Sequence, residues 1–582
     1  MKKVKLFLLF FSVSVAVIAQ NSTYQINMQK MNQLVKFIND AYLDTVNFDV
    51  LVEKGVIEML KELDPHSAYI SKKDVQQANE PLVGSFDGIG VTFQLIKDTI
   101  NIMEVIVNGP SEKVGLKAGD KIIKVDTAIA YGKHVNNKWV ADHLRGQKGT
   151  KVSVFVKRGK NPELLEFSII RDKIPVNSIN VYFMANNNTG YICLERFAQI
   201  SAQEFRDALT RLKARGMKHL IFDLRGNSGG YLQAAFEIAN EFIGNDKMIV
   251  YTDNFRKTGE KFKSNGRGEF QEGRLVVLVD EGSASASEIV SGAVQDWDRA
   301  IVMGRRTFGK GLVQKPIYLA DGSQVRLTIS KYYTPSGRCI QRPYDDGLDS
   351  YTNDLNERSK HGELLTADSI KFPDSLKYQT AKGRIVYGGG GIMPDIFIPL
   401  DTSRYSSFYN EMYRKGVISS FTLDYMDKNR EQLKSKYPTM EDFKYNFEIS
   451  DRMFQELINF AHQEGVKDTV AFQFSKRMEL FVKDKGKELD SLYNSLEDLK
   501  KNAKFQEMLT KYVTESFNES MRLRNLNRAN EFIKDALKYE IARNLFNYGE
   551  ARQIFLMNDE GFLKALEVIN NDKIIKKFNV ER

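Results

Sequence analysis

Two short runs of mainly large apolar residues constrain the fold of this chain most. They are Leu220–Leu224 and Leu275–Val279, and each leads into a glycine-containing turn and then a helical pattern. Such runs are typical of strands buried on both faces, as in parallel sheets with helices on both sides. A third buried strand is expected at Tyr191–Leu194. Residues 175–400 therefore predict an α/β architecture.

The whole chain is too long for one hydrophobic core, because 582 residues correspond to several domains. Short β-branched segments with glycine-rich turns occupy residues 84–171, whereas helical periodicity marks residues 29–63 and the region after 401. The stretch 344–390 is long and polar, and we expect an inserted loop there. The expected parts are a signal peptide at 1–19, a helical region at 20–80, a β-rich domain at 81–172, an α/β core at 173–400 and a helical domain at 401–582.

The N-terminus has the pattern of an export signal. Lys2, Lys3 and Lys5 precede an apolar run, Leu6–Ile18, and Val17–Ala19 forms a cleavage site of small and apolar residues. The run is too short for a good membrane span, and a polar stretch follows it. We therefore expect an exported protein with no integral membrane span after signal removal. If its source is a two-membrane bacterium, the expected location is the periplasm or cell envelope.

Composition argues against several classes of function. The net charge of +9 is a modest excess over 66.6 kDa, and no compact Lys/Arg block is present, so nucleic-acid binding is not expected. Two cysteines exclude a disulfide framework, although a single Cys193–Cys339 bridge stays open. The six histidines are scattered and no HExxH or CxxC pattern occurs, so no metal site is expected.

The segment after the Leu275–Val279 run carries the chemistry. Ser285 and Glu288 stand at capping-box spacing, just before a helical face that starts at Ile289. A hydroxyl at a helix N-cap lies beside unpaired backbone N–H groups at the positive end of the helix dipole. Such donors can stabilise the oxyanion of acyl transfer. Most Ser-x-x-Glu matches are simple caps, so the pattern alone leaves both interpretations open.

Several ordered motifs decide between these interpretations, because together they resemble the C-terminal processing proteases, also called tail-specific proteases. The resemblance covers most of residues 50–400, with Ser228 where proline is common in the family. The motifs are Leu63–Ser67 before a PDZ module, Gly88–Val91 and Gly115–Ile122 within it, Asp223–Gly230, Gly282–Ile289, Phe308–Gly311, Tyr333–Arg338 and Gly391–Asp395.

The resemblance implies a Ser–Lys pair. Ser285 is the expected nucleophile, Lys310 the expected base 25 residues later, and Gln314 the residue that positions the lysine. Ser283 and Ser287 are the competing hydroxyls. Because a free lysine has a pKa of about 10.4, Lys310 must be desolvated to act as a base near neutral pH. Gly309 and Gly311 permit the close backbone approach that desolvation requires.

The oxyanion donors are expected to be the backbone N–H groups of Ala286 and Gly230, with Gly229 as the rival of Gly230. For the PDZ module, the backbone from Asp87 through Gly88, Ile89 and Gly90 to Val91 is the expected cradle of a peptide carboxylate. Arg145 matches an arginine that in some relatives couples PDZ position to the active site. The alternative is a PDZ module that only docks on the core.

The expected fold is thus α/β multidomain: a ClpP/crotonase-like α/β protease core, an inserted β-rich PDZ domain, and helical N- and C-terminal regions. The expected function is an exported serine endopeptidase that recognises free C-termini of protein and peptide substrates, with no metal, cofactor or ATP. The alternative is a non-catalytic PDZ scaffold on the same fold. Homo-oligomerisation through the helical termini and an activating adaptor are further expectations.

Overall fold

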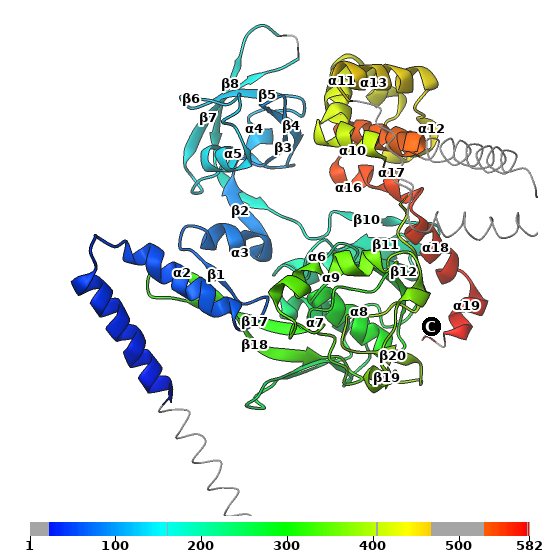
Figure 1. Ribbon diagram of the computed structural model, residues 1–582. Coiled ribbons are helices and arrows are strands. Elements are labelled where there is room, and N and C mark those ends of the chain that lie inside the picture. Colours follow the sequence, from blue (N-terminus) through cyan, green and yellow to red (C-terminus); the bar gives the residue numbers. More distant parts are fainter. Residues whose placement is uncertain (1–22, 160, 403–405, 467–528, 579, 581–582) are drawn as a thin grey trace, which may run out of the picture. The chain divides into compact units, whose positions relative to one another are not determined.

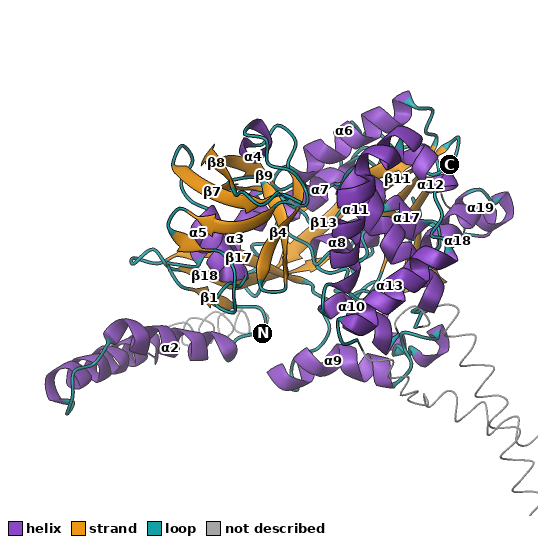
Figure 2. Cartoon of the chain, turned by 90° about the horizontal axis from the view of Figure 1, so that it is seen from above, coloured by secondary structure: helices purple, strands orange, loops and turns teal. Residues whose placement is uncertain are grey.

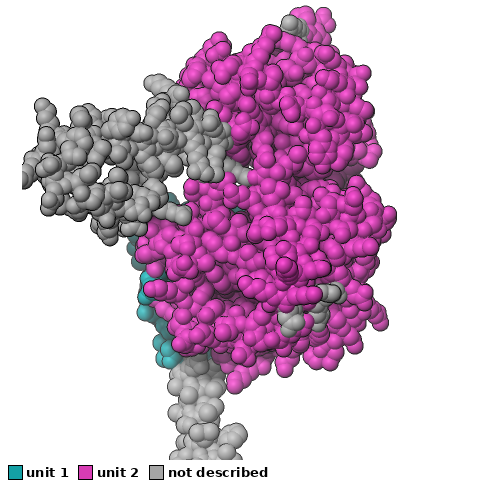
Figure 3. Space-filling view, turned by 90° about the vertical axis from the view of Figure 1, so that its right-hand side faces the viewer, with its two compact units in different colours: residues 1–76, 314–329, 346–348 teal, residues 77–313, 330–345, 349–582 magenta. Residues whose placement is uncertain are grey.

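The computed structural model describes residues 23–159, 161–402, 406–466, 529–578 and 580 (Figure 1). They divide into two compact units (Figure 3), of which the first takes in residues up to 76 with 314–329 and 346–348, and the second takes in the others. The expected signal peptide lies outside the described residues. Among the described residues no helix combines the length and apolarity that a bilayer span requires.

The described residues of the first unit include two helices and parts of three paired strands, β1, β17 (Leu312–Tyr318) and β18. A helix over residues 23–41 precedes α2 (Phe48–Lys61), whose N-cap Asn47 accepts a hydrogen bond from Val50 N. Strand β1 (Ala68–Ile70) pairs antiparallel with the first part of β18 (Gln324–Tyr333). Asp64 fixes this pairing, because its carboxylate accepts from Ser67 Oγ at 2.6 Å and from Thr328 Oγ1 at 2.9 Å. The Leu63–Ser67 motif therefore has a structural role in this unit.

The second unit contains the predicted α/β core. Its sheet has the strand order β10–β11–β12–β15–β16–β21, in which β10 is antiparallel to β11 and the other pairs are parallel. The strands are β10 (Val181–Met184), β11 (Thr189–Cys193), β12 (His219–Asp223), β15 (Leu275–Val279), β16 (Ile301–Gly304) and β21 (Ile396–Phe397). The three runs predicted as buried strands are thus neighbours.

Helices cover both faces of this sheet. One face packs on α6 (Ser201–Ala214), α7 (Leu232–Asn240) and α8 (Ala286–Asp296), whose apolar residues share a cluster with Phe222 and Val277. The other face packs on α18 (Glu560–Ile569) and α19 (Asp572–Lys577), which come from the C-terminal end of the chain. The sheet is therefore buried on both sides, as the continuous apolar strands require.

The β-rich segment forms a separate sheet (β4, β7 and β8 in Figure 2), with the order β3–β4–β5–β7–β8 and β6 on β5. Its elements are β3 (Val91–Ile96), β4 (Thr99–Val105), α4 (Pro110–Lys113), β5 (Lys121–Val125), β6 (Ala128–Ile129), α5 (Asn137–Leu144), β7 (Lys151–Lys157) and β8 (Leu165–Ile170). A two-stranded ribbon of β2 (Ser85–Gly88) and β9 (Asp172–Pro175) connects it to the chain on both sides. β3 is an edge strand of its sheet.

The C-terminal region is helical, as predicted. A cluster of apolar residues joins α10 to α13 with a helix over residues 529–545. The remaining helices are α3 (Val75–Val83), α9 (Leu348–Lys360), α10 (Ser407–Arg414), α11 (Val417–Lys436), α12 (Met440–Asn446), α13 (Asp451–Gln463), α16 (Tyr548–Ala551) and α17 (Gln553–Leu556). The remaining strands are β13 (Met248–Asp253), β14 (Lys261–Lys263), β17 (Leu312–Tyr318), β19 (Lys377–Gln379) and β20 (Ile385–Tyr387). Cys193 and Cys339 are free thiols.

Candidate active site

Three adjacent parallel strands place the expected site residues at one edge of the core sheet. β12 leads into the core loop (residues 224–231), β15 into the serine turn (280–285) and β16 into the lysine loop (305–311). The carboxyl ends of parallel strands lie at the same sheet edge, where ligand sites of α/β folds occur. The order β12–β15–β16 therefore brings the three motifs together in space.

Ser285 occupies an unusual backbone conformation at the start of α8. It is the N-cap residue, with φ 54° and ψ −111°. Such a positive φ is uncommon for a residue with a side chain, and strained backbone of this kind concentrates at functional sites. A sharp strand-to-helix turn with a strained serine is also how other hydrolase folds expose a nucleophile.

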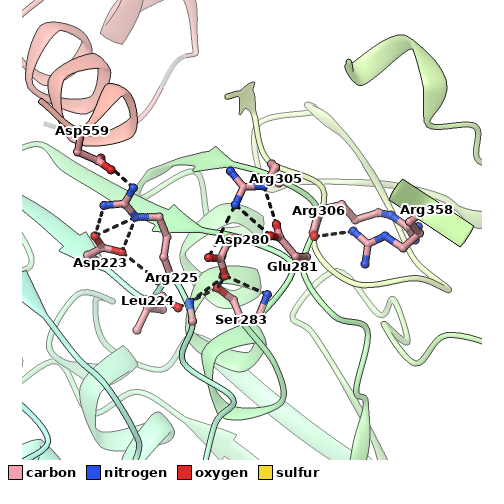
Figure 4. Close-up of polar contacts among 12 residues, drawn as sticks. Asp223, Leu224, Arg225, Asp280, Glu281, Ser283, Arg305, Arg306, Arg358 and Asp559 are labelled. Carbon is pink, nitrogen blue, oxygen red and sulfur yellow. Dashed lines mark hydrogen bonds and ion pairs between the residues drawn. The ribbon is translucent and has the colours of Figure 1, made fainter. Parts of the chain in front are cut away.

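Of the three serines in this turn, only Ser285 has a partly exposed side chain. Ser283 and Ser287 are fully buried. Ser283 Oγ donates to the carbonyl oxygen of Leu224 at 2.8 Å, and Ser287 Oγ donates to that of Asn227 at 2.7 Å. Both hydroxyls therefore join the turn to the core loop (Figure 4 shows the Ser283 contact). This geometry favours Ser285 as the reacting hydroxyl.

The Glu288 carboxylate connects the serine turn to the lysine loop. One oxygen accepts from Ser285 N at 2.7 Å and from Lys310 N at 2.9 Å. The other accepts from Gly309 N at 2.7 Å and from Thr307 Oγ1 at 2.5 Å. The predicted pairing of Ser285 with Glu288 is thus present, but the same carboxylate also binds the loop that carries the lysine.

Glu288 is completely buried, and burial raises the pKa of its carboxyl group to about 7. The four hydrogen bonds act in the opposite direction, because they stabilise the ionised form. Thr307 Oγ1 accepts from Ile392 N at 2.6 Å, so its hydroxyl hydrogen is available to Glu288. All four partners of Glu288 are therefore donors, as a carboxylate requires.

Tyr332 makes a second connection between the same two residues. Its hydroxyl group lies 3.0 Å from the carbonyl oxygen of Ser285 and 2.6 Å from that of Lys310. Tyr332 is buried, and burial raises the pKa of its phenol well above the ordinary value, so it remains a donor. The backbones of Ser285 and Lys310 are thus held together on their N–H side by Glu288 and on their carbonyl side by Tyr332.

The core loop presents the expected oxyanion donors. Gly229 N donates to Asn227 Oδ1 at 2.9 Å, whereas the N–H groups of Gly230 and Ala286 have no partner among the described residues. An ideal Cβ on Gly229 would lie 2.9 Å from Ser285 Cβ and 3.0 Å from Ala286 N. This arrangement favours Gly230 over Gly229 as the second donor.

Gln314 belongs to the first unit, whereas Ser285 and Lys310 belong to the second. Its side-chain amide donates to the carbonyl oxygen of His66. Its expected role beside Lys310 stays a prediction. Among the described residues no group of three or more His, Cys, Asp or Glu side chains could hold a metal ion.

The expected carboxylate cradle precedes the edge strand of the β-rich sheet. Gly88 ends β2, Val91 begins β3, and the N–H groups of Ile89 and Gly90 between them have no partner among the described residues. Asp87 points its carboxylate at Lys148 N, 3.2 Å away. Free N–H groups just before an edge strand are what capture of a peptide C-terminus requires.

Arg145 follows α5 and contacts the segment that leads into the β-rich sheet. Its guanidinium pairs with Glu80 in α3 and lies over the Phe86 ring in β2, 4.4 Å from the centroid. Because α3 and β2 form the connection to this sheet, Arg145 holds the domain to its own connector. A coupling role for Arg145 stays a prediction.

Comparison with known proteins identifies two known domain families in the chain. The sequence pattern of peptidase family S41 matches residues 188–348, and that of the PDZ domain matches residues 88–169. A family of unknown function, DUF8443, matches residues 408–481. Two curated relatives, each named a probable CtpA-like serine protease, come from Staphylococcus aureus (strain MRSA252) and Staphylococcus epidermidis (strain ATCC 12228). They are 34% identical over 322 residues and 32% identical over 323 residues.

The chain is therefore similar to CtpA-like serine proteases, and it carries the sequence patterns of peptidase family S41 and of a PDZ domain. The matched region is 55% of this chain and 64% of each relative, so the chain spans slightly less than two thirds of the curated proteins it resembles. A solved photosystem II D1 C-terminal processing protease is 22% identical over 63% of this chain and 86% of that one, with a TM-score of 0.34. At that TM-score the structural likeness supports no further argument.

Three features of this candidate site were not predicted from the sequence. They are the Tyr332 bridge, the second set of contacts of Glu288, and the contents of residues 344–390. That stretch was expected to be a loop, yet it contains α9 and the β19–β20 hairpin. From it, Arg358 donates to the carbonyl oxygens of Thr307 and Arg306 at 3.2 and 2.7 Å. The insertion therefore supports the lysine loop (Figure 4).

Proposed function

We propose that this chain is an exported serine endopeptidase that captures a free substrate C-terminus with its PDZ domain and cleaves interior peptide bonds through Ser285 and Lys310. One observation carries the proposal: the backbone amides of both residues bind the same buried carboxylate oxygen, at 2.7 and 2.9 Å. If the serine turn and the lysine loop had only a structural role, the strained backbone of Ser285 between them would not be needed.

The chemistry follows from these positions. Neutral Lys310 accepts the proton of Ser285 Oγ while the oxygen attacks the scissile carbonyl, and the carbonyl electrons move to the oxyanion. The N–H groups of Gly230 and Ala286 stabilise that oxyanion. Lys310 then returns the proton to the leaving amine, and water hydrolyses the acyl-enzyme by the same route. In this mechanism Gln314 orients the lysine, on a ClpP/crotonase-like core.

The glycines of the core loop provide a matched pair of variants. An alanine at Gly229 would bring its Cβ to 2.8 Å from Ala284 O and 2.9 Å from Ser285 Cβ, whereas an alanine at Gly226 would meet nothing within 4 Å. Both glycines have positive φ, so both alanines cost about 1 kcal/mol of conformational strain. We expect Gly229→Ala to lower kcat about 100-fold by displacing Ser285. Gly226→Ala should change kcat by less than about threefold, and equal losses in both would contradict the site geometry.

Dependence on the substrate tail tests the proposal as a whole. The substrate is an unfolded reporter protein with an apolar C-terminus, and its control is the same protein with the terminal carboxylate amidated. We expect cleavage of interior bonds in the free-acid reporter, and a kcat/KM that is about tenfold lower for the amide, mainly through KM, because the N–H groups at Ile89 and Gly90 lose an anionic acceptor. Peptide mapping by mass spectrometry locates the cuts. Binding of the tail without any cleavage would instead favour a scaffold.

Further parts of the proposal concern location, regulation and assembly. Residues 1–19 direct export to the periplasm or envelope. Arg145, with or without an activating adaptor, couples the PDZ domain to the active site.

Assembly into a homo-oligomer is supported by the helix over residues 23–41, whose apolar residues are largely exposed in this chain. Among them Tyr24, Met28, Met31 and Val35 recur every three or four residues, as in a helix–helix seam.

A further inference from the structure

Asn227 lies at the centre of the core loop and is fully buried. Its side chain makes two hydrogen bonds: Nδ2 donates to the carbonyl oxygen of Leu194 at 2.8 Å, and Oδ1 accepts from Gly229 N at 2.9 Å. Its carbonyl oxygen accepts two more, from Ala284 N at 3.0 Å and from Ser287 Oγ at 2.7 Å. Asn227 thus connects the core loop to the end of β11, to the serine turn and to the first turn of α8.

The contacts of Asn227 flank both expected oxyanion donors. Its side chain engages Gly229 N, so that the next amide, Gly230 N, is the one left without a partner among the described residues. Its carbonyl oxygen holds residues 284 and 287, which lie on either side of Ala286. The distance between the two donor groups is therefore set largely through Asn227.

The neighbouring contacts leave the core loop little freedom to compensate for a change at Asn227. Phe197 N donates to Gly229 O at 2.9 Å and Tyr231 N donates to Phe197 O at 2.8 Å, which fixes the peptide planes on both sides of Gly230. An ideal Cβ on Gly230 would lie 2.1 Å from Phe197 O, so the backbones are as close there as glycine allows. If Asn227 released Gly229 N, that amide would be a buried donor without a partner or would rotate toward the oxyanion position.

We propose that Asn227 is the positioning residue of the oxyanion hole: it sequesters Gly229 N–H and fixes Gly230 N–H against Ala286 N–H. This inference rests on the proposed peptidase function. Asn227 touches neither substrate nor reacting atoms, so its effect is on transition-state stabilisation through the two amides. Precise placement of such donors matters because loss of one typically costs about 10²–10³-fold in kcat.

The test compares Asn227→Ala with Asn240→Ala in the full chain. Asn240 is the matched control, because it is also a buried asparagine of this unit and its Oδ1 accepts a backbone hydrogen bond, from Asn265 N at 2.9 Å. The readouts are kcat and KM for a peptide substrate, and the affinity for a peptide trifluoromethyl ketone. Ser285 Oγ adds to that ketone as its proton passes to Lys310, leaving an oxyanion in the hole.

We expect Asn227→Ala to lower kcat at least 30-fold, with KM changed less than about threefold. The affinity for the trifluoromethyl ketone should fall by a factor similar to that in kcat. Asn240→Ala should lower the unfolding temperature but leave kcat within about threefold. If both variants lose kcat in proportion to their loss of stability, or if Asn227→Ala raises KM alone, the inference is overturned.

Two further measurements keep the result decisive. If Asn227→Ala does not fold, Ser287→Ala removes only the hydroxyl that donates to the Asn227 carbonyl, and we expect a three- to tenfold fall in kcat with KM unchanged; an unchanged kcat would contradict the inference. Hydrogen exchange of the peptide covering residues 226–231 should accelerate in Asn227→Ala and not in Asn240→Ala. An inert wild type would overturn the proposed function and this inference with it, whereas an active wild type with a fully active Asn227→Ala would overturn this inference alone.

Discussion

Replacing Ser285 with alanine is expected to lower kcat/KM for an unfolded protein substrate by about 10⁴–10⁶-fold, the range seen when a serine nucleophile is removed. The fold should survive, because the serine turn is held by Ser283 Oγ, Ser287 Oγ and the Glu288 carboxylate rather than by the Ser285 side chain. Cleavage assays and thermal unfolding of the purified protein measure the two quantities. The residual cleavage rate of Ser285→Ala measures how much the oxyanion donors accelerate hydrolysis without the nucleophile.

Two controls separate chemistry from strain. Ser285→Gly should be equally inactive but more stable than Ser285→Ala by about 1 kcal/mol, because glycine adopts the observed φ of 54° without strain. Ser283→Ala and Ser287→Ala should keep far more activity than Ser285→Ala. A Ser285→Ala protein that still cleaved, beside an inactive Ser283→Ala or Ser287→Ala that folds, would mean that the nucleophile is misassigned.

Glu288→Gln is also expected to lower the activity strongly. A carboxylate accepts from four donors here, whereas a glutamine amide has one oxygen and presents N–H groups to the other pair. One pair of donors then loses its acceptor. It is either Ser285 N with Lys310 N, or Gly309 N with Thr307 Oγ1. Because both pairs fix the serine relative to the lysine, we expect kcat to fall about 100-fold.

The same carboxyl group gives stability a defined pH dependence. Its pKa is raised to about 7 from 4.5 in the unfolded chain, chiefly by burial, so its contribution to stability is fully present below pH 4.5 and is lost as the pH rises through 7. Wild type should therefore lose unfolding free energy between pH 5 and pH 8 relative to Glu288→Gln, by roughly 2.5 kcal/mol. Denaturant unfolding at the two pH values measures the difference.

Glu281 supplies the control for this experiment. It lies on the serine turn just before α8, but its carboxylate pairs with Arg305. Its pKa is lowered, because two hydrogen bonds and the Arg305 charge outweigh burial. Glu281→Gln should therefore show the wild-type slope between pH 5 and pH 8. If Glu281→Gln and Glu288→Gln abolish the slope equally, the buried carboxylate at Glu288 is not its source.

The sequence was sufficient to predict those features of the core that depend on local pattern. The runs at Leu220 and Leu275 became adjacent strands, because a continuous apolar strand needs cover on both faces. Ser285 was predicted at the helix start from its spacing to Glu288, which local backbone geometry requires. Burial of Ser283 and Ser287 adds support for Ser285 that the sequence could not supply, and the nucleophile stays a prediction.

Features that depend on distant contacts could not be predicted in this way. In the sequence, Tyr332 cannot be distinguished from other aromatic residues of a strand. Its hydroxyl group contacts the carbonyl oxygens of Ser285 and Lys310 only when β18 packs against the core. Asn227 stands in a recognisable motif, yet its partners Leu194 and Ala284 lie 33 and 57 residues away in the chain. The support from residues 344–390 was missed because a polar segment carries little periodicity even when its arginines are buried.

The most direct test of the Ser–Lys mechanism is to find which residue becomes acylated during turnover. A slow peptide ester is mixed with wild type or Lys310→Ala, the reaction is quenched with acid, and the acyl group is mapped by peptide mass spectrometry. The mechanism predicts an acyl group on Ser285 in wild type and its loss in Lys310→Ala. An acyl group on another residue, or undiminished acylation of Ser285 without Lys310, would contradict it.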